Sequence, residues 1–142
     1  MPHLRAATKD AAISELLDVL AARGHVTDEP AARQAVLARE RAGTTAAGRG
    51  LALPHAKTDA VDRTALALGR PSEPVPFGLS RGEPAELIVL LLSPPAAAQD
   101  HIRLLARLAR VLESDGLRRR IARATDAQGI HDLLRERELK LY

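Results

Sequence analysis

Residues 48–57 read GRGLALPHAK, a glycine-rich turn followed by a short apolar strand and a Pro-His pair. Pro54 fixes its own φ and biases Leu53 toward an extended backbone, which predicts a strand that stops at this point. The strand would present the His55 imidazole at its end, beside small residues and hydroxyls. Such a histidine is a candidate for chemistry, and a hydrogen-bonded histidine at the edge of a loop is the ordinary alternative.

Two helices are predicted upstream of this segment. Asp10 is expected to cap the first, which ends at Gly24 and has apolar residues at helical spacing: Ile13, Leu16, Leu17 and Leu20. The second begins after Thr27 or Asp28, with Pro30 in its first turn and Arg39 near its C-terminal end. Residues 43–50 are expected to form a turn of small residues.

The downstream half contains the most apolar segment of the chain. Residues 86–92 predict a central strand that is covered on both faces. Residues 51–53 and 64–68 predict further strands, and the proline-rich residues 71–84 predict a loop with an extended piece at 75–77. A helix is expected from about Gln99 to Glu113, with further helices at 117–124 and after Thr125. Predicted strands thus alternate with predicted helices along the chain. This order favours an α/β fold, with residues 1–142 forming a single domain.

Composition excludes several classes of protein. Of the 142 residues, 46% are hydrophobic, but Phe and Tyr occur once each and Trp is absent, so the core must be aliphatic. The net charge of +3 is interleaved along the chain, and no aromatic platform is present to stack bases, which argues against a nucleic-acid partner. The chain lacks cysteine, a signal-peptide core and an apolar run long enough to span a membrane. We therefore expect a cytoplasmic protein without direct membrane insertion.

Five histidines are candidates for a site. Structural or surface roles are expected for His3, His25 and His131. His101 differs, because it lies in the first turn of the helix that follows the most hydrophobic strand. Ligand sites in α/β sheets cluster outside strand ends, so His101 and His55 are expected to converge there. By itself, His101 would be read as a surface helix residue.

Other kinds of site lack the residues they need. Zinc sites use three or four suitable ligands, and the chain has neither cysteine nor a His-Glu-x-x-His pair, so no metal is predicted. The Gly-x-Ser-x-Gly elbow of serine hydrolases is absent. Residues 43–50 are similar to a phosphate-cradling loop, but without the Gly-Lys-Ser/Thr ending of a nucleotide-binding P-loop. No cofactor is therefore expected.

Taken together, these segments resemble a known family. The runs RERAGTT (residues 39–45) and GRGLALPH (residues 48–55) are similar to the IIA component of the bacterial phosphoenolpyruvate-dependent sugar phosphotransferase system, of the fructose/mannitol type. Phe77-Gly78, the apolar strand at 87–92 and Asp100-His101-Ile102 agree with it. The resemblance extends from about Ala11 to Glu136.

The resemblance implies a mixed β-sheet flanked by helices and a phosphotransferase function. In that family, the histidine that matches His55 is phosphorylated by the small phosphocarrier protein HPr and passes the phosphoryl group to a cysteine or histidine of a IIB component. The residues that match His101 and Arg39 line the same pocket, and Thr44 or Thr45 is expected to add a hydroxyl to the phosphate site. A neutral imidazole is a competent nucleophile, since its unperturbed pKa is about 6.5. The acceptor that orients the His55 ring is not identifiable from the sequence.

Three functions remain open at this point. The first is a phosphocarrier for uptake of fructose or a related sugar, acting with a separate IIB component. The second is a regulatory protein similar to the nitrogen-related IIA proteins, although Pro-His-Ala-Lys at residues 54–57 favours the fructose type. The third is a partner-binding domain without phosphoryl chemistry. Weak candidates for a docking surface are Leu51, Leu53, Leu79 and residues 96–98, and the aliphatic faces would allow a homodimer.

Overall fold

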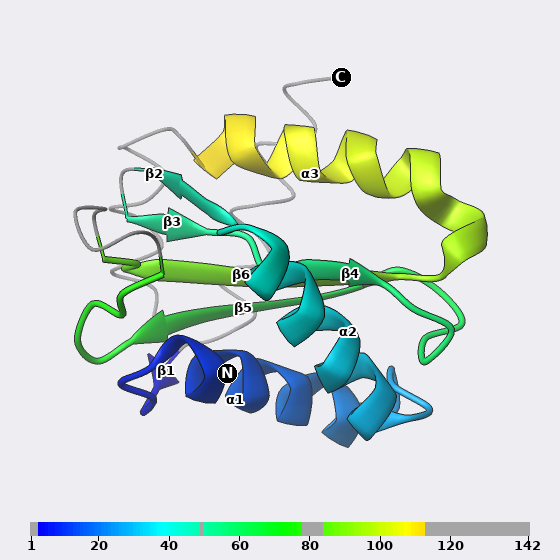
Figure 1. Cartoon of the computed structure of the whole chain (residues 1–142), viewed down its shortest axis with the longest axis horizontal. Coiled ribbons are helices and arrows are strands. Elements are labelled where there is room, and N and C mark those ends of the chain that lie inside the picture. Colours follow the sequence, from blue (N-terminus) through cyan, green and yellow to red (C-terminus); the bar gives the residue numbers. More distant parts are fainter. Residues whose placement is uncertain (1–2, 49, 78–83, 113–142) are drawn as a thin grey trace.

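A mixed sheet forms the centre of the computed structural model, which describes residues 3–48, 50–77 and 84–112 (Figure 1). Its strand order is β1-β5-β6-β3-β2, with β4 also pairing with β6. The strands are β1 (His3–Leu4), β2 (Ala46–Gly48), β3 (Leu51–Ala52), β4 (His55–Lys57), β5 (Ala65–Pro71) and β6 (Leu87–Ser93). β3 and β4 run parallel to β6, whereas β5 runs antiparallel to it. The predicted α/β class with a mixed sheet is confirmed.

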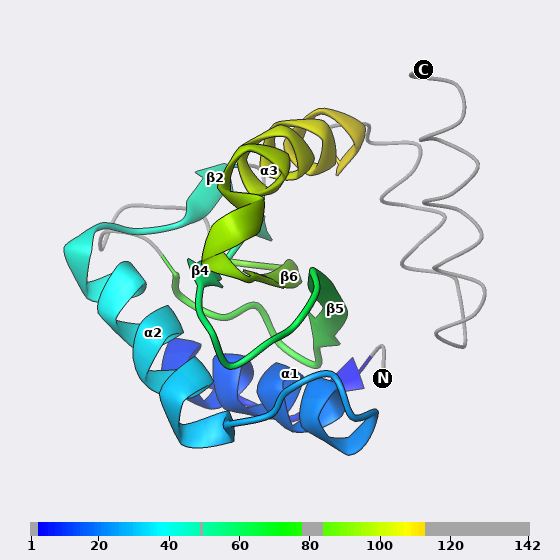
Figure 2. The ribbon, with the colours of Figure 1, turned by 90° about the vertical axis from the view of Figure 1, so that its right-hand side faces the viewer.

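Helices cover both faces of the sheet. Helices α1 (Lys9–Ala22) and α2 (Glu29–Ala42) lie on one face, and α3 (Ala98–Leu112), which follows the short 3-10 helix η1 (Pro95–Ala97), lies on the other (Figure 2). Each face has its own aliphatic core, as the composition requires. The larger core lies under α1 and α2, and a smaller one under α3 consists mainly of Leu51, Leu53, Leu87, Val89, Leu108 and Leu112. The helices in the described part of the chain all fall short of the length and apolar character that a membrane span requires.

Strand β6 is the centre of the fold, and each of its residues is buried. Alternate side chains of a strand point to opposite faces. Leu87 and Val89 therefore belong to the core beneath α3, and Ile88, Leu90 and Leu92 belong to the core beneath α1 and α2. The expected strand at residues 86–92, covered on both faces, is thus confirmed.

The strand before Pro54 ends as the sequence predicts, because β3 stops at Ala52, but a second strand, β4, begins at His55 and was not predicted. Leu51 pairs with Leu87 and His55 pairs with Leu91, so β3 and β4 keep the same parallel register along β6. Pro54 has no N–H to donate, but its carbonyl oxygen accepts from the Leu91 N–H at 3.0 Å. Pro54 thus lies between two short strands that both pair with β6, and His55 is the first residue of β4 and not the residue after the end of β3.

Helix termini account for other differences from the sequence-based boundaries. Thr8, and not Asp10, caps α1, because its side chain accepts a hydrogen bond from the Ala11 N–H. Asp28 caps α2 in the same way, which decides between the two starts, after Thr27 or after Asp28, that the sequence left open. Strand β2 replaces part of the turn expected at residues 43–50. The predicted helices at 117–124 and after Thr125 lie outside the described residues, as do His131 and Leu79.

Candidate functional site

An open pocket of about 350 Å³ lies where α2, β4 and α3 meet. Strand β4 carries two of its side chains on the sheet face that α3 covers, because His55 and Lys57 alternate with the inward-facing Ala56. Helix α2 contributes Arg39 from the other helical layer. The complete lining is Ala35, Arg39, His55, Ala56, Lys57, His101, Ile102 and Leu105. The structure therefore brings together the three residues that the sequence singled out from distant segments.

The His55 ring is held by the backbone of its own strand. Its Nδ1 lies 2.8 Å from the Leu53 carbonyl oxygen, two residues before it. A carbonyl oxygen only accepts hydrogen bonds, so Nδ1 carries the proton and Nε2 keeps a free lone pair. Burial lowers the pKa of the half-buried His55 imidazole, and the positive charges of Arg39 and Lys57 add to this effect against the opposing Leu53 hydrogen bond. His55 is therefore neutral at pH 7, with the Nε2 lone pair free of any hydrogen bond to the protein.

His101 faces His55 across the pocket. The ring centroids are 5.3 Å apart, and the ring planes are tilted by 53°. His101 is buried, with Nδ1 2.7 Å from the Ser93 hydroxyl and Nε2 without a hydrogen-bond partner. Burial, together with the charges of His55 and Lys57, lowers the pKa of His101 to about 4. Its ring is thus neutral at pH 7 and leaves one nitrogen for a ligand.

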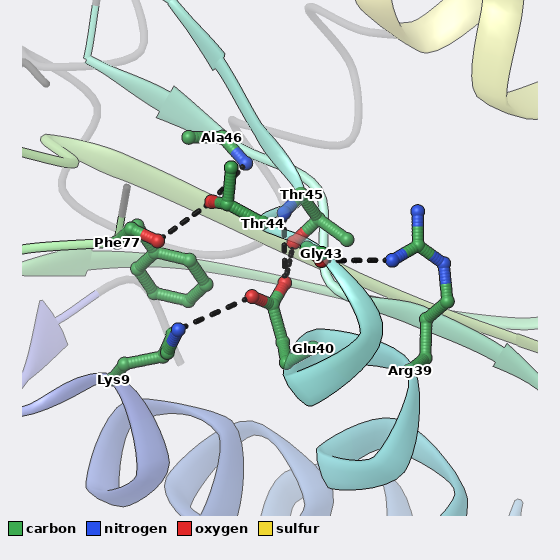
Figure 3. Close-up of polar contacts among 8 residues, drawn as sticks. All are labelled: Lys9, Arg39, Glu40, Gly43, Thr44, Thr45, Ala46 and Phe77. Carbon is green, nitrogen blue, oxygen red and sulfur yellow. Dashed lines mark hydrogen bonds and ion pairs between the residues drawn. The ribbon is translucent and has the colours of Figure 1, made fainter. Parts of the chain in front are cut away.

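Two cationic side chains complete the pocket. Arg39 donates one hydrogen bond to the Gly43 carbonyl oxygen at 2.8 Å, which fixes its guanidinium at the C-terminal end of α2 (Figure 3). Lys57 is exposed at the rim. Lys57 was not expected in the site, because a strand that ends at Pro54 does not include it. The alternation of β4 would have placed Lys57 beside His55 if the strand had been extended.

Thr44 and Thr45 do not line this pocket. The Thr44 hydroxyl donates to the Phe77 carbonyl oxygen at 2.7 Å and accepts from the Ala46 N–H, and the Thr45 hydroxyl donates to Glu40 Oε1 (Figure 3). Both hydroxyls are therefore engaged in structural hydrogen bonds. The phosphate contact predicted for these two residues stays a prediction.

Glu40 joins this loop to the site through the backbone. Its Oε1 also accepts from the Thr45 N–H at 3.1 Å, and the Thr45 carbonyl oxygen accepts from the N–H of Leu53, the residue that holds His55. Burial raises the pKa of the Glu40 carboxyl, opposed by the ion pair with Lys9 at 3.4 Å. This contact of Glu40 is not predictable from the sequence, because a glutamate near the end of an amphipathic helix has the pattern of a solvated charge.

Acidification is expected to destabilise the fold through the two histidines. Both have a lower pKa in the folded protein than the usual 6.5, so the unfolded chain binds more protons as the pH falls below 6.5. The stability that their neutral forms provide is fully present above pH 6.5 and is lost toward the His101 pKa of about 4. Urea denaturation across this range will measure the loss. Over this pH range, the unfolding free energy of His101→Gln should fall less than that of the wild type. Equal falls would contradict the attribution of the acid sensitivity to His101.

The pocket combines an imidazole that has a free nitrogen with cationic groups that can hold an anion. A neutral imidazole presents Nε2 to a pocket that also holds a guanidinium and an ammonium group, both suited to the oxygens of a phosphoryl group. Within residues 3–48, 50–77 and 84–112, no group of three or more His, Asp or Glu side chains is placed to hold a metal ion. Ile102 also lines the pocket and is 62% exposed.

Comparison with known proteins agrees with this chemistry. The sequence profile of the family described as "Phosphoenolpyruvate-dependent sugar phosphotransferase system, EIIA 2" matches residues 2–137. A fructose-specific EIIA component of Haloferax volcanii is 46% identical over 71 residues, which cover 50% of this chain and 46% of the relative. A fructose-specific EIIABC component of Bacillus subtilis is 36% identical over 75 residues, or 53% of this chain and 12% of that protein. The aligned part is thus less than half of each relative.

Solved structures show the same fold over nearly the whole chain. The nitrogen regulatory protein IIA-Ntr of Neisseria meningitidis superposes with a TM-score of 0.84 at 27% identity, covering 94% of this chain and 90% of that one. The mannitol IIA of Escherichia coli gives 0.78 at 29% identity, covering 93% and 92%. Its complex with phosphorylated IIB gives 0.79 at 28% identity, covering 94% and 92%. Because the family profile matches residues 2–137, almost the whole chain, the chain belongs to the EIIA type 2 family of the phosphoenolpyruvate-dependent sugar phosphotransferase system.

Proposed function

We propose that this protein is a histidine phosphocarrier that accepts a phosphoryl group from phosphorylated HPr on His55 Nε2. It then passes the group to a IIB component in the cytoplasm, for uptake of fructose or a related sugar. The hydrogen bond from His55 Nδ1 to the Leu53 carbonyl oxygen carries this proposal, because it leaves Nε2 as the free nucleophile. The family match and the fructose-specific relative support the sugar-uptake role.

The transfer step needs no cofactor. The Nε2 lone pair attacks the phosphorus in line with the breaking N–P bond, and that bonding pair returns to the imidazole of the donor. The Nδ1 proton stays on the His55 ring, and the Leu53 carbonyl oxygen stabilises the positive charge that the ring gains. Arg39 and Lys57 balance the charge of the phosphoryl oxygens. Transfer to IIB repeats the step, with His55 as the leaving group.

Loss of Arg39 is expected to slow acceptance of the phosphoryl group by about 10²-fold, since a donor that stabilises charge in the transition state is removed. The measurement is the initial rate of labelling of Arg39→Ala by phosphorylated HPr. Arg41→Ala is the matched control, because Arg41 lies on the same helix and is exposed outside the pocket. Equal rates for the two variants would contradict the role given to Arg39.

The proposed function is tested with the wild-type protein, phosphoenolpyruvate, enzyme I and HPr. We expect one phosphoryl group per chain, labile in acid and stable in base, with phosphorus coupled to the ring protons in the pattern of an Nε2 adduct. Attachment at Nδ1 would overturn the assignment of the nucleophile. The absence of label, with HPr shown to be active, would move the protein to the class of partner-binding domains.

A regulatory role is the second candidate, and the similarity to IIA-Ntr of Neisseria meningitidis favours it. In that case, the phosphorylation state of His55 would control binding to other proteins. The labelled protein distinguishes the two roles when it is mixed with a fructose-type IIB domain. Rapid transfer of the label supports sugar uptake, whereas retention of the label supports the regulatory role.

A further inference from the structure

Ser93 places a buried hydroxyl behind the site. It is the last residue of β6, is fully buried and follows six consecutive apolar residues of that strand. Its Oγ lies 2.7 Å from His101 Nδ1 and 3.2 Å from the Thr64 hydroxyl oxygen, at the start of the segment that leads into β5. These contacts lie on the side of His101 away from its unpartnered Nε2.

The proton of the Ser93 hydroxyl determines what His101 offers the pocket. The neutral imidazole carries one ring proton, on either nitrogen. If Nδ1 donated to Ser93, Nε2 would present a lone pair, which repels phosphoryl oxygens. If Ser93 donates to Nδ1, the ring proton lies on Nε2, and His101 becomes a hydrogen-bond donor toward the pocket. The two arrangements have the same heavy-atom positions, but His101 Nε2 is a hydrogen-bond acceptor in the first and a donor in the second.

We propose that Ser93 is a positioning residue that donates its proton to His101 Nδ1 and so holds His101 as the Nε2–H tautomer. The second part, donation from Nε2–H to a phosphoryl oxygen on His55, rests on the function proposed above. The first part concerns the free protein and is independent of that function. Ser93 thus acts on the reaction only through His101.

Two observations favour this direction of the hydrogen bond. The 2.7 Å separation is in the range of hydroxyl donors and shorter than most N–H donors give. The second observation is that the Thr64 side chain is exposed, so that water can donate to its hydroxyl oxygen and Thr64 does not need the Ser93 proton. The Thr64 proton is then free to reach Ser93 Oγ, which leaves the Ser93 proton for His101.

The register of β6 explains why one strand orients both histidines. Leu91 pairs with His55, and Ser93 pairs with Lys57, so the two positions lie on the sheet face beneath α3. The Leu91 N–H binds the Pro54 carbonyl oxygen and helps hold the backbone that leads into His55. Ser93 then reaches His101 on the opposing helix. A small hydroxyl residue at this one position of an otherwise aliphatic strand fits the proposed role.

The tautomer is measured directly by long-range ¹H–¹⁵N correlation NMR of the free protein at neutral pH, with its histidine rings labelled with ¹⁵N. We expect His101 of the wild type to carry its proton on Nε2. In Ser93→Ala, the Nε2–H form should lose its dominance, and Ser93→Thr should restore it. A wild-type ring protonated on Nδ1, or a tautomer unchanged in Ser93→Ala, would overturn the proposal. An amide spectrum that superposes on the wild type shows that each variant is folded.

Phosphoryl acceptance tests the second part. Ser93→Ala should lower the maximal rate of labelling by phosphorylated HPr about 10-fold, at an unchanged half-saturating HPr concentration. Thr64→Val, which removes only the outer hydroxyl, should give a smaller loss. A folded Ser93→Ala variant with a changed tautomer and the wild-type rate would overturn the second part alone. Failure of the wild type to accept phosphate would refute the proposed function and leave the tautomer result standing.

Discussion

Replacement of His55 by alanine is expected to abolish labelling by phosphorylated HPr, with a fall in rate of roughly 10⁴-fold or more. The variant lacks His55 Nε2, the nitrogen whose lone pair the Leu53 hydrogen bond leaves free beside the pocket cations. The remaining pocket residues are expected to stabilise charge and not to carry the phosphoryl group. The measurement is the transfer of ³²P from phosphoenolpyruvate through enzyme I and HPr, followed on acid-free gels.

His25→Ala is the matched control for this experiment. His25 is exposed between α1 and α2 and does not line the pocket, so this variant should be labelled at the wild-type rate. His101→Ala should still accept label, because the proposed nucleophile His55 is intact. Labelling should be slow, because the hydrogen-bond donor that we propose at His101 is lost. Full labelling of His55→Ala would show that another residue carries the phosphoryl group.

Leu90→Ala is expected to cost about 3 kcal/mol of unfolding free energy and to lower the melting temperature by roughly 10 °C. Leu90 is fully buried at the middle of β6, in the core that α1 and α2 cover. Truncation removes its transfer free energy and leaves a cavity that the close-packed neighbours fill only partly. Urea denaturation should show a lower midpoint with an unchanged slope.

The surface variant Ile102→Ala removes a similar aliphatic side chain from a position that is 62% exposed. Its unfolding free energy should stay within about 0.5 kcal/mol of the wild type. If Leu90→Ala changed the unfolding free energy as little, β6 would not be the centre of the core. The pair of variants therefore tests the position of the strand independently of any activity.

Hydrophobic pattern and capping residues were sufficient for much of the fold. The leucine-rich run at residues 86–92 predicted the central strand, and Thr27 or Asp28 followed by Pro30 predicted the start of α2 to within one residue. Strand β4 was missed because a proline usually ends a strand. Here the parallel register with β6 continues on both sides of Pro54, which no local pattern records.

For the site, too, local sequence patterns predicted some residues and missed others. Motif resemblance selected Arg39, His55 and His101, and the structure brings them into one pocket. Ser93 and Glu40 were missed because their roles depend on contacts that no sequence pattern encodes. Ser93 Oγ meets His101 between a strand and a helix, and Glu40 reaches His55 only through successive backbone hydrogen bonds.

By itself, the sequence determined the α/β class, the aliphatic core and the histidine that we propose as the phosphoryl carrier. These depend on periodicity, composition and residue type, which are properties of the chain itself. Only the tertiary structure decided which nitrogen of His55 is free, what lies behind His101 and that Lys57 joins the pocket. The physical reason is that hydrogen-bond direction, burial and the field of nearby charges arise when distant segments pack together.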